Sequence, residues 1–143
     1  MDLYTIETAI MTKFASVLTA STGYQGELPA FTEGAIPNMF AIAMGDGNEP
    51  IQVTSDEAYF AIEMNVRFMA GYGSREKALD DVSLLWGLLP FDDADIDGIQ
   101  RLQISTAPSI QRAVLRREND QSDGGGDQRV WAVDMQMLLT VEV

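Results

Sequence analysis

Three aspartates stand at alternate positions near the middle of the chain, and such spacing is typical of calcium-binding loops. Asp93, Asp95 and Asp97 precede Gly98, which matches the first six positions of an EF-hand loop. The second half does not match, because the ninth position is Arg101 and the twelfth, which should be a bidentate glutamate, is an isoleucine. The run therefore predicts either a weak calcium site or a solvated connection between a helix and a strand.

A second group of charged side chains lies near the C-terminal end, where arginines bracket an acidic, glycine-containing loop. These charges either pair with a neighbouring subunit or pair with one another at an exposed surface. Arg67 stands on the polar side of a predicted strand and is a further candidate for a subunit contact. The candidate interface residues are Arg67, Arg112, Arg116, Arg117, Glu118, Asp120, Asp123 and Asp127.

Cysteine and histidine are both absent from the sequence. Their absence excludes disulfides, thiol nucleophiles, Cys/His zinc sites and histidine bases, so we predict a protein that is not an enzyme and has no cofactor. The formal net charge of −13 argues against a protein that grips phosphate backbones. A surface that lets DNA pass without holding it would be acidic in this way, although solubility alone explains the same charge.

The elements that must position these residues are clearest between Tyr59 and Leu89. Apolar residues first occupy every second position, as in a strand with one buried face. After two glycines the period changes to three and four, which predicts an amphipathic helix capped by Ser74 and ended by Pro90. Trp86 falls on the predicted buried face of this helix.

Three further segments complete the predicted fold. The sequence indicates a helix over 2–20 with Asp2 as its N-cap, a strand over 38–44, and a last strand from Trp131 to the end of the chain. Residues 21–34 and 118–128 are predicted loops, and Pro108 is expected to break the strand that begins near residue 99. We predict one domain over residues 1–143, of class α+β. It has a four-stranded, mainly antiparallel sheet with two helices on one face, in the order α-β-β-α-β-β.

The residue order resembles that of the tail terminator proteins of long-tailed, lambda-like bacteriophages. The resemblance begins with the N-terminal helix and extends over nearly the whole chain. It is carried by the stretches LPAFTEGAIPNMFAIAMGD (28–46) and TSDEAYFAIEMNVRFMAG (54–71), by the charged loop 116–127, and by the final strand RVWAVDMQMLL. The half EF-hand and the triple glycine depart from the family's pattern.

The resemblance implies a structural virion protein with no enzymatic activity. Its expected partners are five further copies in a hexameric ring, the tail tube protein, the head-to-tail connector protein, and genomic DNA that passes through the lumen without specific binding. The ring would cap the tail tube, stop its polymerisation and present the head-joining surface. It would be assembled in the host cytoplasm and lie in the neck region of the virion, with no membrane partner. Two alternatives stay open: another phage neck or tail-completion protein, and a calcium-modulated binding module.

Overall fold

The computed structural model describes residues 2–29, 38–45, 52–55, 60–116 and 127–142. Within them are two helices, α1 (Leu3–Val17) and α2 (Arg75–Leu88). The strands are β1 (Thr22–Gln25), β2 (Met39–Met44), β3 (Gln52–Ser55), β4 (Phe60–Tyr72), β5 (Phe91–Asp92), β6 (Arg101–Arg116) and β7 (Asp127–Glu142).

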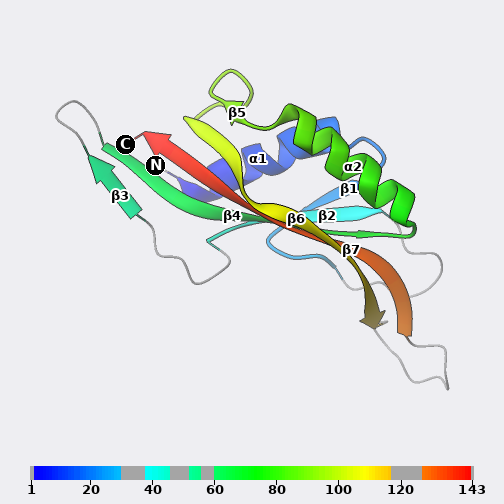
Figure 1. Cartoon of the computed structure of the whole chain (residues 1–143). Coiled ribbons are helices and arrows are strands. Elements are labelled where there is room, and N and C mark those ends of the chain that lie inside the picture. Colours follow the sequence, from blue (N-terminus) through cyan, green and yellow to red (C-terminus); the bar gives the residue numbers. More distant parts are fainter. Residues whose placement is uncertain (1, 30–37, 46–51, 56–59, 117–126, 143) are drawn as a thin grey trace.

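All seven described strands belong to one sheet. Its order is β1-β2-β4-β7-β6-β5, and β3 pairs with the beginning of β4. Only the β1–β2 pair is parallel among the described strands, and the other pairs are antiparallel. Both helices lie over the same face of this twisted sheet, with α1 above β1 and β2 (Figure 1).

The predicted four-stranded sheet with the order α-β-β-α-β-β is wrong. The chain adds β1 within the predicted loop 21–34, adds the short strands β3 and β5, and makes the sheet mixed. β6 also runs without a break through Pro108. The pairing of β6 with β7 shifts register between Ile104 and Ser109, and such irregularities accommodate a proline, which has no N–H group to donate to the neighbouring strand. Each missed strand is short or interrupted, so none carries a long alternating pattern.

The hydrophobic core lies between the helices and the covered face of the sheet. Its centre is an aromatic cluster in which Phe14 of α1 contacts three phenylalanines from three strands. The ring centroids are 6.4 Å from Phe40, 5.8 Å from Phe68 and 5.9 Å from Phe91. Because each ring removes a large apolar area from water, this cluster ties α1 to β2, β4 and β5.

The ends of both helices confirm the predicted caps. The Asp2 carboxylate accepts a hydrogen bond from the backbone N–H of Tyr4, and the Ser74 hydroxyl accepts one from the N–H of Lys77. These bonds satisfy N–H groups that have no partner inside the helix. The predicted burial of Trp86 is wrong, because 58% of this side chain is exposed. The buried stripe of α2 consists of Ala78, Asp81 and Leu85 instead.

β6 is the longest open edge of the described sheet. It pairs with β7 along its whole length, but β5 covers it on the other side only at Arg101 and Leu102. Together β6 and β7 extend past the end of β4 as a hairpin that leaves the body of the molecule (Figure 1). The backbone groups that face outward from Gln103 onward therefore have no strand partner among the described residues.

Candidate functional site

The aspartate loop between β5 and β6 is held by its own polar groups. The Asp95 carboxylate accepts a hydrogen bond of 3.1 Å from the Asp92 N–H, and the Asp92 carboxylate accepts one of 2.9 Å from the Ala94 N–H. Ile96 and Ile99 are each only 3% exposed and anchor the loop in the core. The loop is thus a compact connection with two apolar anchors.

The three aspartates of the calcium hypothesis, Asp93, Asp95 and Asp97, are all exposed. An open hollow of about 490 Å³ lies beside Asp93 and Asp97, while Asp95 is engaged with the loop backbone. Over the described ranges, no three acidic side chains are placed to hold a metal ion. The geometry therefore adds no support to the calcium hypothesis.

Arg67 lies on the uncovered face of the sheet and pairs with Asp134 of the neighbouring strand. Its Nε and one terminal nitrogen contact the two carboxylate oxygens at 3.1 and 2.6 Å. About a third of the Arg67 side chain and 42% of the Asp134 side chain are exposed. Two parallel hydrogen bonds of this kind fix geometry well, so the pair ties β4 to β7 within one chain.

Arg112 lies elsewhere, near the outer end of β6. Its guanidinium group is 5.6 Å from the ring centroid of Trp131, which faces it across the β6–β7 pair. Trp131 is on the same side of β7 as the buried Val133, whereas Asp134 is on the other side. Arg67 and Arg112 therefore project from opposite faces of the sheet and do not form one patch.

The other predicted interface residues lie at or beyond the end of the hairpin. Arg116 and Asp127 face each other as backbone partners in the last described pair of β6 and β7. The remaining positions fall outside the described residues; they are Arg117, Glu118, Asp120 and Asp123.

A buried polar network that the sequence analysis missed joins three parts of the fold. The Asp81 carboxylate, 8% exposed, accepts hydrogen bonds from the Ser21 hydroxyl at 2.8 Å and from the Tyr72 hydroxyl at 2.7 Å. The pKa of the Tyr72 hydroxyl is raised well above its usual range. Burial is the largest cause, and the hydrogen bond to Asp81 and the negative charge of Asp81 add to it. The sequence signal for this network was Asp81, an acidic residue at helical spacing from the buried Ala78 and Leu85 of α2.

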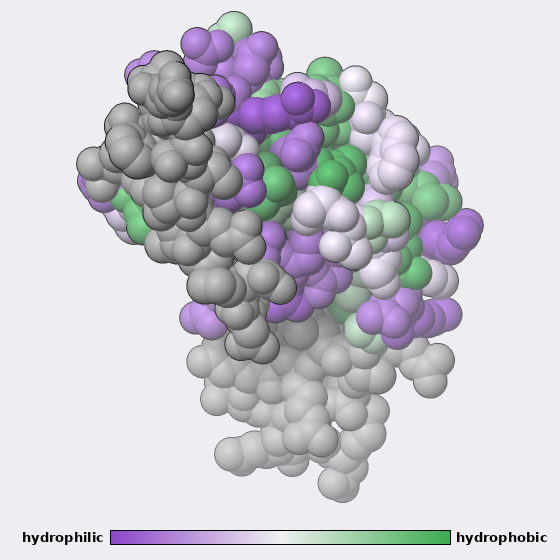
Figure 2. All heavy atoms as spheres, turned by 60° about the vertical axis from the view of Figure 1, so that its left-hand side comes forward, coloured by the Kyte–Doolittle hydropathy of each residue, from purple (hydrophilic) through white to green (hydrophobic). Residues whose placement is uncertain are grey.

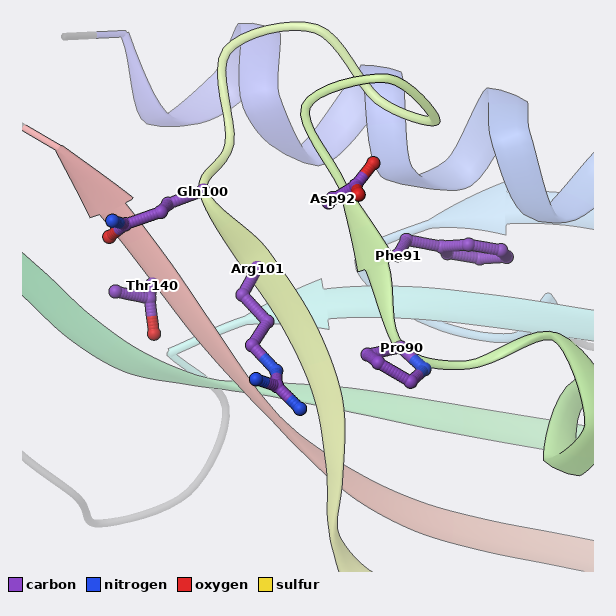
Figure 3. A pocket seen from close by; sticks show the side chains of 6 residues that line it. All are labelled: Pro90, Phe91, Asp92, Gln100, Arg101 and Thr140. Atoms are coloured by element: carbon purple, nitrogen blue, oxygen red, sulfur yellow. The ribbon is translucent and has the colours of Figure 1, made fainter.

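A hollow of about 420 Å³ with a mixed polar and apolar lining opens where β5, β6 and β7 meet. It is lined by Pro90, Phe91, Asp92, Gln100, Arg101 and Thr140. Figure 3 shows Arg101 and Thr140 on adjacent strands, with Asp92 on the other side of β6. No ion pair joins Arg101 to another of the described residues.

A smaller, mainly apolar hollow of about 270 Å³ lies at the start of α1. It is lined by Leu3, Tyr4, Glu7, Met44, Gly45 and Met64. The Glu7 carboxylate closes one side, since it accepts hydrogen bonds from the Met44 N–H at 2.8 Å and from Gln25 at 3.1 Å. In Figure 2 the end of the molecule that carries β3 and the chain termini faces the reader. Hydrophobic and hydrophilic residues are interspersed on the surface seen there.

Comparisons with known proteins do not identify the chain. No protein-family model matches it, and no curated protein matches its sequence. Of the helices in the described ranges, neither is long and apolar enough to cross a membrane.

Proposed function

We propose that this protein is a structural subunit of a bacteriophage tail, and that it forms the ring that terminates the tail tube. The ring stops growth of the tube and offers the surface to which the head connector binds. The resemblance over 28–46, 54–71 and the final strand supports this role. The partners are further copies of the chain, the tube protein and the connector protein, and the site of action is the neck of the virion.

The observation that carries the proposal is the long, open β6 edge and the hairpin that continues from it. From Gln103 onward, β6 offers unpaired backbone donors and acceptors along a solvent-facing edge within the described sheet. Such an edge can accept a strand from another chain, and soluble monomers usually cover or shorten it. In an assembly, neighbouring copies can form hydrogen bonds with the unpaired N–H and C=O groups of this edge.

The charge of the chain fits a ring around a DNA passage. Each copy carries a formal charge of −13, and a ring multiplies that charge around its lumen. Fixed negative charge repels phosphates at short range and is screened beyond about 10 Å at 0.1 M salt. DNA would pass through such a lumen without being retained.

The direct test is to add the purified chain to tail tubes and to image the tube ends by negative-stain electron microscopy. We expect the isolated chain to scatter light as a species near 15.7 kDa and to form a six-fold ring on tube ends. Binding to connectors with no density on tubes would instead identify another neck protein. A monomer that assembles on neither structure would contradict the proposal.

A further inference from the structure

Helix α2 exposes more large apolar side chains than it buries. Its buried residues are Ala78, Asp81 and Leu85. Four large hydrophobic side chains of the same helix are exposed, by 36% to 58%: Leu79, Leu84, Trp86 and Leu88. The described part of the chain exposes only two others of this kind, Leu3 and Tyr4 of α1. Large apolar side chains that gather on one exposed element are typical of a surface that another molecule covers.

The exposed side chains of α2 form two rows. About 100° of rotation separates successive residues of a helix, so residues three, four or seven apart lie near one another. The two rows are Leu79 with Trp86, and Leu84 with Leu88. Between the rows lie Ser83 and Gly87, which are both exposed, and a Cβ atom added at Gly87 would meet nothing within 4 Å. These small residues let the backbone of another helix come close while its side chains pack on the two rows.

Carboxylates lie at both ends of this apolar surface. Residues 82–91 carry no charge, whereas Asp80 is exposed one turn before Ser83. Beyond the end of α2, the segment 92–97 carries four exposed aspartates, and Figure 1 shows this loop beside the end of the helix. An open hollow of about 490 Å³ lies beside Asp93 and Asp97. One cation lies near, since the Lys13 ammonium is 5.5 Å from the Phe91 ring centroid.

The local charge stays negative when every residue of this region is counted. From residue 74 to residue 100 the chain has seven acidic and two basic side chains, a formal charge of 2 − 7 = −5. All of these residues belong to the described part of the chain. A partner with positive charge beside its apolar side chains would therefore complement the surface.

We infer that α2 and the aspartate loop form a docking surface for a basic amphipathic helix of another protein. The apolar side of that helix covers the two rows, with Trp86 as the main anchor because exposed tryptophans often dominate binding energy. Its lysines or arginines face the carboxylates beyond the end of α2. A second copy of this chain does not fit, because two acidic surfaces would meet. The β6 edge is not part of this surface, so the inference goes beyond the proposed ring contact.

A synthetic peptide of leucine and lysine, about 18 residues long and with leucines at helical spacing, is a suitable probe. Its binding to the isolated full chain is measured by the fluorescence anisotropy of a dye on the peptide. A peptide with glutamate in place of each lysine is the matched control. We expect the lysine peptide to bind at least about tenfold more tightly than the glutamate peptide, and less tightly as salt rises.

Variants of the chain show where the peptide binds. Trp86→Ala should weaken binding about tenfold or more, and Asp97→Asn should weaken it about threefold at low salt. Each has a control elsewhere on the surface: Tyr4→Ala removes an exposed aromatic side chain of α1, and Glu27→Gln removes an exposed carboxylate. Both controls should leave the affinity unchanged. Thermal unfolding verifies that each variant is folded.

Four outcomes would overturn the inference. They are no binding of the lysine peptide at micromolar concentrations, equal binding of the two peptides, equal binding to the Trp86→Ala and unmodified chains, and self-association that Trp86→Ala abolishes. The third would mean that the peptide binds elsewhere on the acidic chain, and the fourth would identify a second copy as the occupant. Because the measurement uses the isolated chain, failure to cap tail tubes would refute the proposed function and leave this inference standing.

Discussion

The two faces of β4 show how one strand can serve two purposes. On the covered face Met64, Val66, Phe68 and Ala70 are all at most 5% exposed and pack under the helices. On the other face the alternating residues are only half-buried, and Arg67 is engaged in an ion pair. The covered face of β4 buries these side chains and so contributes much of the free energy of folding, whereas the other face of β4 contributes less. Changes on the two faces should therefore have effects of very different size.

The largest effect is expected at the centre of the aromatic cluster. Phe14→Ala removes a side chain with no exposed surface and leaves a cavity beside three rings. We expect the free energy of unfolding to fall by about 3–5 kcal/mol, measured by urea denaturation. Tyr4→Ala on the same helix is the control, since Tyr4 is 70% exposed and its loss should change stability by less than about 0.5 kcal/mol. Equal effects would contradict the assignment of Phe14 to the core and of Tyr4 to the surface.

The next largest effect tests the close contact between β1 and β2. A Cβ atom on Gly23 would lie 2.6 Å from Cζ of the buried Phe40 ring, so Gly23→Ala must displace that ring. We expect a loss of about 1–3 kcal/mol in denaturant unfolding. Gly87→Ala is the matched substitution in α2, where a Cβ meets nothing within 4 Å, and it should stabilise the chain by up to about 1 kcal/mol. A neutral Gly23→Ala would refute the packing described for β1.

A third prediction concerns the buried network under α2. Tyr72→Phe removes one of two donors to the buried Asp81 carboxylate and should lower stability at pH 7 by about 1–2 kcal/mol. The folded state also holds the Tyr72 proton more tightly than the unfolded state, in which the pKa of this hydroxyl is near 10.0. The contribution of Tyr72 to the free energy of unfolding should therefore be fully present below pH 10. It should fall as the pH rises above 10, because the unfolded state releases this proton first. Unfolding free energies across this range should fall less steeply in Tyr72→Phe; identical slopes would argue against the raised pKa.

The smallest effect is expected on the uncovered face. The Arg67–Asp134 pair is partly exposed, so its coupling energy in a double-mutant cycle with alanine should be at most about 1 kcal/mol and should shrink as salt screens it. A coupling of several kcal/mol would mean that this face is as important for folding as the covered one.

The sequence predicted the elements whose signals are local. Asp2 and Ser74 were identified as caps because a short polar side chain there satisfies free N–H groups, and β4 was found from its regular alternation. β1 was missed because four residues, one of them glycine, carry no periodic pattern. Its position depends on pairing with β2 and on packing under α1, which are contacts between distant parts of the chain.

The candidate site shows the same limit. Pro108 was expected to end a strand, but an edge strand with register shifts tolerates it, and only the sheet order shows that β6 is an edge. Trp86 was expected in the core because helical spacing alone cannot show that Asp81 occupies part of the buried stripe. The ion pair of Arg67 with Asp134 likewise depends on the β4–β7 register.

The most direct test of the account is electron cryo-microscopy of tail-tube ends after addition of the unmodified chain, at a resolution that traces individual strands. The account predicts a closed ring of six copies on the tube end, with the β6 edge of each copy at a subunit boundary. Tube ends without added density would contradict the proposed function. A ring in which α2 or the uncovered face of the sheet forms the subunit boundary would contradict the role assigned to the β6 edge.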